Sequence, residues 1–64
     1  MYKVKGFRVM VGMTQEDMAN AIGVSPRTYI NKETGKSEFT INEFHAIKEV
    51  LLKKGLKVTL EDLI

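Results

Sequence analysis

The apolar residues at the start of the chain repeat with the spacing of a helix, without the alternation of a strand. Val4, Phe7 and Val11 lie at positions i, i+3 and i+7, and Val9 and Met10 widen the same stripe. This VKGFRVMVG stretch is the only one rich in β-branched residues, and the chain contains neither Asn-Gly nor Asp-Gly, the strongest hairpin signals. The pattern therefore predicts an all-α protein whose first helix faces the core.

The start signals of the later helices agree with one another. Ser25 is a candidate N-cap because Pro26 follows it at the first helical position, where a missing N–H costs nothing. Each of three threonines is followed three residues later by an acid, which is the arrangement of a capping box. These pairs are Thr14 with Asp17, Thr40 with Glu43, and Thr59 with Asp62.

Apolar residues flank these caps, and glycines follow the apolar stretches. The residue before each cap and the residue at N4 are both apolar, so each pair can form a hydrophobic staple. The candidate staples are Met13 with Met18, Val24 with Tyr29, Phe39 with Phe44, and Val58 with Leu63. Glycines stand where helices need a left-handed C′ residue, at Gly12, Gly23, Gly35 and Gly55. The sequence thus predicts five helices, near residues 2–11, 15–22, 26–34, 41–54 and 60–64.

Length and composition restrict the chain to one small domain, residues 1–64. Folding a chain of 64 residues buries only about 60% of its unfolded surface, which leaves room for a single core. The chain has no Cys, so neither a disulfide nor a thiolate metal site braces it. No apolar run approaches the roughly 20 residues of a membrane span. We therefore expect a soluble, cytoplasmic domain that does not contact a membrane.

The charge is small but unevenly distributed. The net charge is +2, which alone is weak support for any partner. Residues 1–36 carry six Lys and Arg against three acids, whereas residues 37–64 carry four against five. The cationic half is also the half in which a helical pattern stops at IGVSP and resumes at once.

This interruption has the form of a helix-turn-helix spanning residues 14–35. A helix that ends at Ile22, a turn that contains Gly23, and a new helix capped by Ser25 match that arrangement. Because Ala19 is small, it allows the two helices to approach closely. Met18, Ile22, Val24 and Tyr29 are expected to fill the angle between the two helices. The second helix is then held out on the surface, with its N-terminal end first.

A helix presented in this way fits the major groove of duplex DNA, where its N-terminal residues reach base edges. If Tyr29 points inward, the opposite face carries Arg27, Ile30, Asn31 and Thr34. Arg donates bidentately to guanine, Asn pairs with adenine, and an apolar side chain packs on the thymine methyl group. Ile30 could equally pack against the preceding helix. The candidates for base readout are Pro26, Arg27, Ile30 and Asn31.

At these residues the sequence resembles the phage-repressor and Cro-like helix-turn-helix regulators, the XRE family. The resemblance runs from Lys3 to Val50, with MTQEDMANAIGVSPRTYINKETGK as its core, and resumes weakly at VTLEDLI. The positions that match the family pattern are Thr14, Gln15, Ala19, Gly23, Val24, Ser25, Glu33 and Gly35. The resemblance implies a compact five-helix, lambda-repressor-like fold and a bacterial or phage-encoded repressor that binds double-stranded DNA.

The resemblance also implies roles for single residues. It implies that Gln15 contacts a DNA phosphate, that residues 25–31 read bases, and that Arg8 and Glu33 pair across the domain. The phosphate candidates are Gln15, Ser25, Thr28 and Lys36. Alternatively, Lys36 could only interact favourably with the dipole of the helix that ends before it. The chain departs from the family at Lys32, where an apolar or aromatic residue is usual, and in the longer segment IKEVLLKKGLKVT.

The C-terminal tail carries more apolar residues than so small a core obviously needs. A helix of about five residues is too short to persist alone, so it must pack on this chain, on a second copy, or on both. We expect a homodimer on DNA, although the tail could merely seal the core. The candidate dimerisation residues are Leu56, Val58, Leu60, Leu63 and Ile64.

Enzymatic and metal-binding functions have little support in the sequence. His45 is the only His and HAIKE has no ligand spacing, so no metal site is expected. The chain has no glycine-rich phosphate loop and no catalytic set that could converge, so neither an enzyme, a cofactor nor a small-molecule substrate is expected. The main alternative to a DNA-binding regulator is a protein-interaction module, an antitoxin or adaptor that keeps the same fold.

Overall fold

The computed structural model describes residues 3–64, which form five α-helices and no strand. The helices are α1 (Val4–Met10), α2 (Gln15–Ile22), α3 (Pro26–Glu33), α4 (Ile41–Lys53) and α5 (Leu60–Leu63). The predicted all-α, five-helix architecture is confirmed. The bounds differ from the predicted ones by the residue or two by which helix ends fray. The predicted start of the first helix at residue 2 lies outside the described residues.

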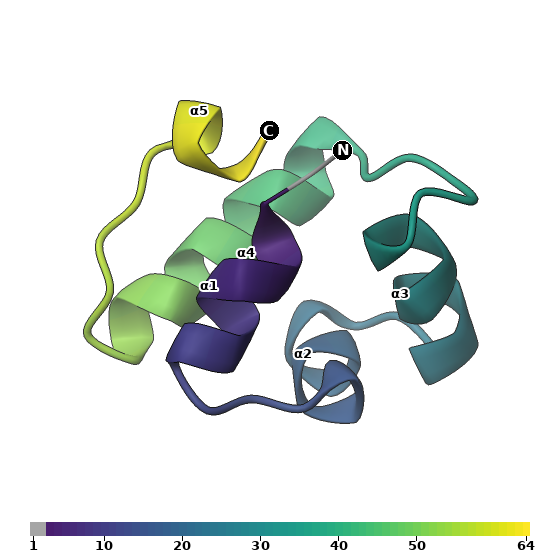
Figure 1. Cartoon of the computed structure of the whole chain (residues 1–64), viewed down its shortest axis with the longest axis horizontal. Coiled ribbons are helices and arrows are strands. Elements are labelled where there is room, and N and C mark those ends of the chain that lie inside the picture. Colours follow the sequence, from purple (N-terminus) through teal and green to yellow (C-terminus); the bar gives the residue numbers. More distant parts are fainter. Residues whose placement is uncertain (1–2) are drawn as a thin grey trace.

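The helices surround α4, which is the longest. Figure 1 shows α1 lying across α4, α2 and α3 together on one side, and α5 at the opposite end. α2 packs on both α3 and α4, while α5 packs on α4. The helix-turn-helix thus forms one side of the molecule, and the C-terminal tail forms the other. No helix of the described chain is long and apolar enough to cross a membrane.

The predicted caps form as reciprocal pairs. At the start of α2, the Asp17 amide donates to the Thr14 hydroxyl at 3.0 Å, and the Thr14 amide donates to the Asp17 carboxylate at 2.9 Å. The same box caps α4 through Thr40 and α5 through Thr59. A cap of this kind contributes about 1 kcal/mol. These short helices therefore begin where the sequence places them.

The end of α2 depends on Gly23. This residue has φ of 82°, and its N–H donates to the Ala19 carbonyl at 3.0 Å. The Val24 N–H donates to the same carbonyl at 3.0 Å, so both turn amides are satisfied by one oxygen. The other predicted stops, at Gly12, Gly35 and Gly55, also have positive φ.

All five helices contribute to one core. Its fully buried large side chains are Val4, Met18, Tyr29, Ile47, Leu51 and Leu63. Ala19 is also fully buried, as the close approach of α2 and α3 requires. The rings of Tyr29 and Phe39 lie 5.9 Å apart, and those of Phe39 and Phe44 lie 5.3 Å apart. This aromatic series connects α3 to α4 through the loop between them.

The tail belongs to the same core, which corrects part of the dimer prediction. Leu63 is fully buried and Val58 is 5% exposed, so both are wrong as dimer contacts. α5 is too short to hold its shape alone, and packing these two side chains on the domain is what stabilises it. The backbone N–H of Lys3 also donates to the Leu63 carbonyl at 3.1 Å. Leu56 and Leu60 are half-buried, and only Ile64 is largely exposed.

Candidate nucleic-acid interface

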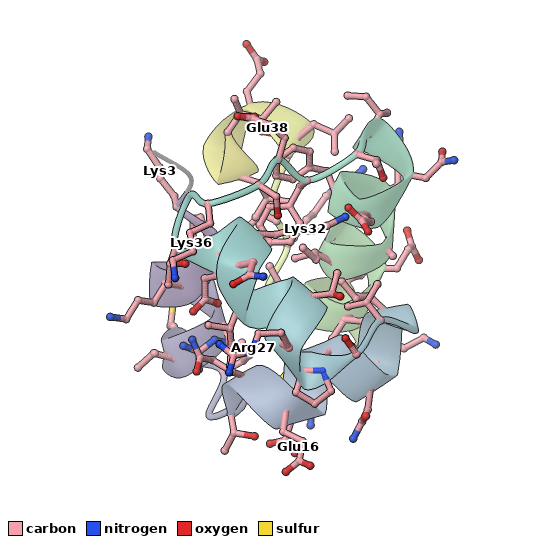
Figure 2. The ribbon with its side chains drawn as sticks, turned by 90° about the vertical axis from the view of Figure 1, so that its right-hand side faces the viewer. Lys3, Glu16, Arg27, Lys32, Lys36 and Glu38 are labelled. Carbon is pink, nitrogen blue, oxygen red and sulfur yellow. The ribbon has the colours of Figure 1, made fainter. Side chains whose placement is uncertain are left out.

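α3 lies on the surface with one side packed inward and the other side open. Tyr29 is fully buried, whereas Pro26, Arg27 and Thr28 in the first turn are exposed. Figure 2 views this side of the molecule, with α3 in front and Arg27 extending along it. The geometry therefore brings the predicted readout residues of the first turn to an open face.

The second turn of α3 is less open. Ile30 and Asn31 are each half-buried, so they lie toward the edge of the exposed face. Thr34 follows at the helix end and is exposed, with its hydroxyl donating to the Ile30 carbonyl at 2.7 Å. Arg27 is therefore the most accessible of the predicted base-contact side chains that carry hydrogen-bond donors.

The cap of α3 uses one of the predicted phosphate ligands internally. The Ser25 hydroxyl accepts from the Thr28 amide at 3.2 Å and donates to the Thr28 hydroxyl at 2.9 Å. The Ser25 proton is thus engaged within the protein, while the Thr28 hydroxyl keeps its own proton for an outside acceptor. Of these two exposed residues, Thr28 is the better donor to a phosphate.

Behind α3 lies the ion pair between Arg8 and Glu33, the partners implied by the resemblance. Arg8 Nε and Nη2 donate to the two Glu33 carboxylate oxygens at 2.9 and 3.1 Å. The two residues are 7% and 5% exposed. Arg8 Nη1 donates to the Met13 carbonyl at 2.7 Å, so the guanidinium also holds the loop before α2. Arg8 therefore faces inward and is not a DNA contact.

Glu33 accepts two further hydrogen bonds that the sequence analysis did not predict. The Tyr29 hydroxyl donates to Glu33 Oε2, and Gln15 Nε2 donates to Oε1 at 3.0 Å. The Tyr29 hydroxyl is therefore engaged inside the domain and is not free for water or a phosphate, because it donates to Glu33. Gln15 is half-buried, and its amide group is partly committed to the same carboxylate. Tyr29 and Glu33 lie four residues apart on α3, so helical spacing was a signal that could have paired them. No spacing rule connects Gln15 to Glu33, because they meet only when α2 and α3 pack.

The electrostatics follow from this arrangement. Burial raises the pKa of the Glu33 carboxyl, but hydrogen bonds from Arg8, Tyr29 and Gln15 outweigh burial and hold it below 4.5. The hydrogen bond to Glu33 raises the pKa of Arg8 against the opposing effect of burial. Burial and the bond to Glu33 raise the pKa of the Tyr29 hydroxyl well above 10.0. Glu33 is thus a buried anion that fixes α3 to α1 and α2.

Lys32, the departure from the family pattern, has a partner on α4. Its Nζ lies 2.6 Å from both carboxylate oxygens of Glu43. Burial raises the pKa of the Glu43 carboxyl, but hydrogen bonds from Lys32 and the Thr40 amide outweigh burial and lower it. An ion pair therefore occupies the position at which the family resemblance predicts an apolar or aromatic residue. The burial of Tyr29 shows that α3 has the expected register.

Two further cations, Lys36 and Lys3, lie beside α3 (Figure 2). Lys36 is exposed just beyond α3, where its backbone N–H donates to the Asn31 carbonyl at 2.8 Å. In Figure 2, Lys36 and Lys3 lie on the same side of α3 as Arg27, whereas Glu16 and Glu38 lie toward opposite ends of the molecule. His45 is exposed on α4. No group of three or more potential metal ligands occurs among the described residues.

Comparison with known proteins agrees with this geometry. The model of a helix-turn-helix family matches residues 4–54, which include the first four helices and the whole of the α3 face. Comparisons with curated proteins and with solved structures gave no significant match. The part of the chain beyond residue 54, which contains α5, lies outside the family match.

Proposed function

Because the chain belongs to the helix-turn-helix family of Cro- and repressor-like DNA-binding regulators, we propose that it reads double-stranded DNA with α3 in the major groove. We further propose that it acts as a phage-type repressor, by occupying an operator. The observation that carries this proposal is the first turn of α3, which is capped, exposed and backed by the buried Tyr29. An end-on helix of this kind reaches base edges without moving the core.

The proposed base contacts centre on Arg27. Its exposed guanidinium has the fork geometry that pairs with guanine O6 and N7. Pro26 lies beside it at the helix start, where its ring can pack on a base or sugar. Ile30 and Asn31 are half-buried, so they contact bases only if the helix enters the groove deeply. Arg27 is accordingly assigned the largest share of the specificity.

The proposed phosphate contacts lie around the ends of α2 and α3. Thr28 and Lys36 are exposed and offer a hydroxyl and an ammonium. Gln15, at the first position of α2, has one amide hydrogen directed at Glu33 and a second one that remains for a phosphate. Ser25 contributes chiefly by holding Thr28. These contacts position the domain on the duplex without reading sequence.

We also propose that two copies bind together. The largest dimension of the domain is 27 Å, which is less than the roughly 34 Å between successive major-groove half-sites. One copy therefore reads one half-site, and a palindromic operator requires a second copy. The remaining dimerisation candidates are the half-buried Leu56 and Leu60 and the exposed Ile64.

Selection of bound duplexes from a random pool, at a stated salt concentration, tests this function. We expect a short, roughly palindromic motif and a steep fall of affinity with salt, about 0.9 in d log K/d log[salt] for each phosphate neutralised. Failure to enrich any motif, together with a shallow salt dependence, would contradict the proposal. That result would instead favour the protein-interaction module.

A further inference from the structure

Lys32 is a charged residue of α3 that the proposed DNA contacts do not use. Its Nζ lies 2.6 Å from both carboxylate oxygens of Glu43, and the two side chains are only 14% and 16% exposed. In Figure 2 the Lys32 side chain extends from α3 toward α4, on the opposite side of α3 from Lys36. The pair therefore connects the exposed helix to the longest helix of the domain.

The acceptor of this ion pair is itself held in place. Glu43 Oε1 accepts from the Thr40 amide at 2.8 Å, and the Glu43 amide donates to the Thr40 hydroxyl at 3.1 Å. The carboxylate is thus fixed by the capping box of α4, so Lys32 binds an anchor that does not move with α3. Because both side chains are mostly out of solvent, salt screens their attraction less than that of a surface pair.

Lys32 and Glu33 are consecutive, and they fix α3 from two sides. Neighbouring residues of a helix point about 100° apart around its axis. Glu33 is bound to Arg8 of α1 and Gln15 of α2, while Lys32 is bound to Glu43 of α4. A rotation of α3 about its axis lengthens one of these links, so the two together oppose rotation in either direction.

We propose that Lys32 is a positioning residue, whose ion pair with Glu43 sets the rotation of α3 and hence the direction in which Arg27 meets a base. This inference rests on the proposed function, because it concerns the same face of α3. Bidentate contact with guanine demands a narrow range of directions, whereas contact with phosphates tolerates a wider one. Loss of the link therefore lowers specificity more than it lowers general affinity for DNA.

Two variants remove the link while keeping the helices. Lys32→Met keeps most of the length of the side chain without its charge. Glu43→Gln removes the charge but keeps the capping box, since Gln at N3 also serves that role. Matched controls are Lys57→Met and Glu49→Gln, which change exposed residues of the same types. For each protein, the affinities for the selected operator and for a random duplex are measured over a range of salt, with the folded fraction taken from circular dichroism.

Each variant is expected to lower the ratio of operator affinity to random-duplex affinity about tenfold, because a misdirected Arg27 loses base discrimination. The double variant should lose no more than either single variant, because both remove one interaction. The salt slope of Lys32→Met should equal that of wild type, because Lys32 neutralises no phosphate. The control variants should keep the wild-type ratio.

Several outcomes would overturn this inference. If the affinities for operator and random duplex fall by the same factor, Lys32 only stabilises the domain. If both affinities are unchanged, Lys32 has no role in DNA binding. A salt slope that falls by about 0.9 in Lys32→Met would make Lys32 a phosphate contact instead. If the specificity losses of the two single variants add up in the double variant, Lys32 and Glu43 do not act through their shared ion pair. If wild type selects no duplex, the proposed function fails first, and the wild-type measurement alone reveals this.

Discussion

Glu33 accepts hydrogen bonds from Arg8, Gln15 and Tyr29, which makes it the residue on which three helices depend. A charge buried this deeply is stable only while its partners are present. The requirement is mutual, because Arg8 at 7% exposure is equally unable to regain water without opening the core. Glu33 therefore holds the proposed DNA-binding face in position from inside the domain.

Glu33→Gln should destabilise the fold strongly, because it leaves the Arg8 guanidinium buried without a counter-charge. Breaking a buried pair in this way costs on the order of 3 kcal/mol, a large part of the stability of so small a domain. Urea denaturation measures the loss. Glu61→Gln, at an exposed position of α5, is the matched control and should change the unfolding free energy little. A Glu33→Gln midpoint equal to that of the control would contradict this account.

Arg27→Ala tests whether a single side chain reads a base. We expect the variant to lose about 1–3 kcal/mol of operator binding and to accept any base at one position of the motif. The variant should fold normally, because Arg27 is exposed. Competition binding against operators changed at single positions is the measurement. A uniform loss across all sequences would make Arg27 a phosphate contact.

At the scale of elements, the lengths of these helices are set by short backbone signals. Two glycines that occupy different backbone conformations provide a test. Gly6 lies inside α1, whereas Gly23 ends α2 with φ of 82°. Apart from the adjacent residues and the backbone of the same helix, an added Cβ would meet no atom within 4 Å at either position. Any effect of substitution by Ala is thus an effect of backbone preference.

Gly6→Ala should stabilise the domain by about 0.5–1 kcal/mol, because Ala loses less entropy in a helix. Gly23→Ala should destabilise it by about 1–2 kcal/mol, because an L residue is strained in the left-handed region. Thermal melts of both variants give the comparison. Shifts of the same sign would show that something other than backbone conformation decides these positions.

At the scale of the whole molecule, stability should have an acid limit and an alkaline limit. The pKa of Glu33 is held below 4.5 in the folded state, so the unfolded chain takes up its proton first and stability falls as the pH drops below about 4.5. The pKa of Tyr29 is raised, so the unfolded chain loses its proton first and stability falls as the pH rises above about 10.

Urea midpoints between pH 2 and pH 11 should therefore be highest between these limits. Tyr29→Phe is the diagnostic variant, because it has no proton to lose and should flatten the alkaline side relative to wild type. Since Phe also leaves Glu33 with one donor fewer, the comparison concerns the slope and not the absolute stability. A parallel decline of both proteins above pH 10 would assign the alkaline limit to other groups.

The proposed dimer can be tested at the C-terminal tail, where Leu63 is buried and the adjacent Ile64 is exposed. Ile64→Glu should lower operator affinity with little effect on folding, because Ile64 is 55% exposed. Leu63→Glu should unfold the domain, because it places a charge in the core. Sedimentation of the complexes, with circular dichroism of the free proteins, separates the two effects. Tight binding of Ile64→Glu as a two-copy complex would exclude Ile64 from the interface.

The sequence alone determined the features that depend on neighbouring residues. Capping boxes at Thr14, Thr40 and Thr59, and the left-handed stop at Gly23, involve atoms at most a few residues apart. Their geometry is set by local covalent structure, so the residue pattern was sufficient to place the helices and the interruption between α2 and α3. The family resemblance added the pairing of Arg8 with Glu33, which local rules do not reach.

Only the tertiary structure decided the contacts between distant segments. The pattern could not show that Gln15 donates to Glu33, or that Lys32 meets Glu43 across the loop, because these contacts depend on how helices pack. It could not show that Leu63 is buried while Ile64 is exposed, since both are apolar and adjacent. An apolar side chain gains free energy on burial, but only the packed core determines which of two neighbouring side chains is buried.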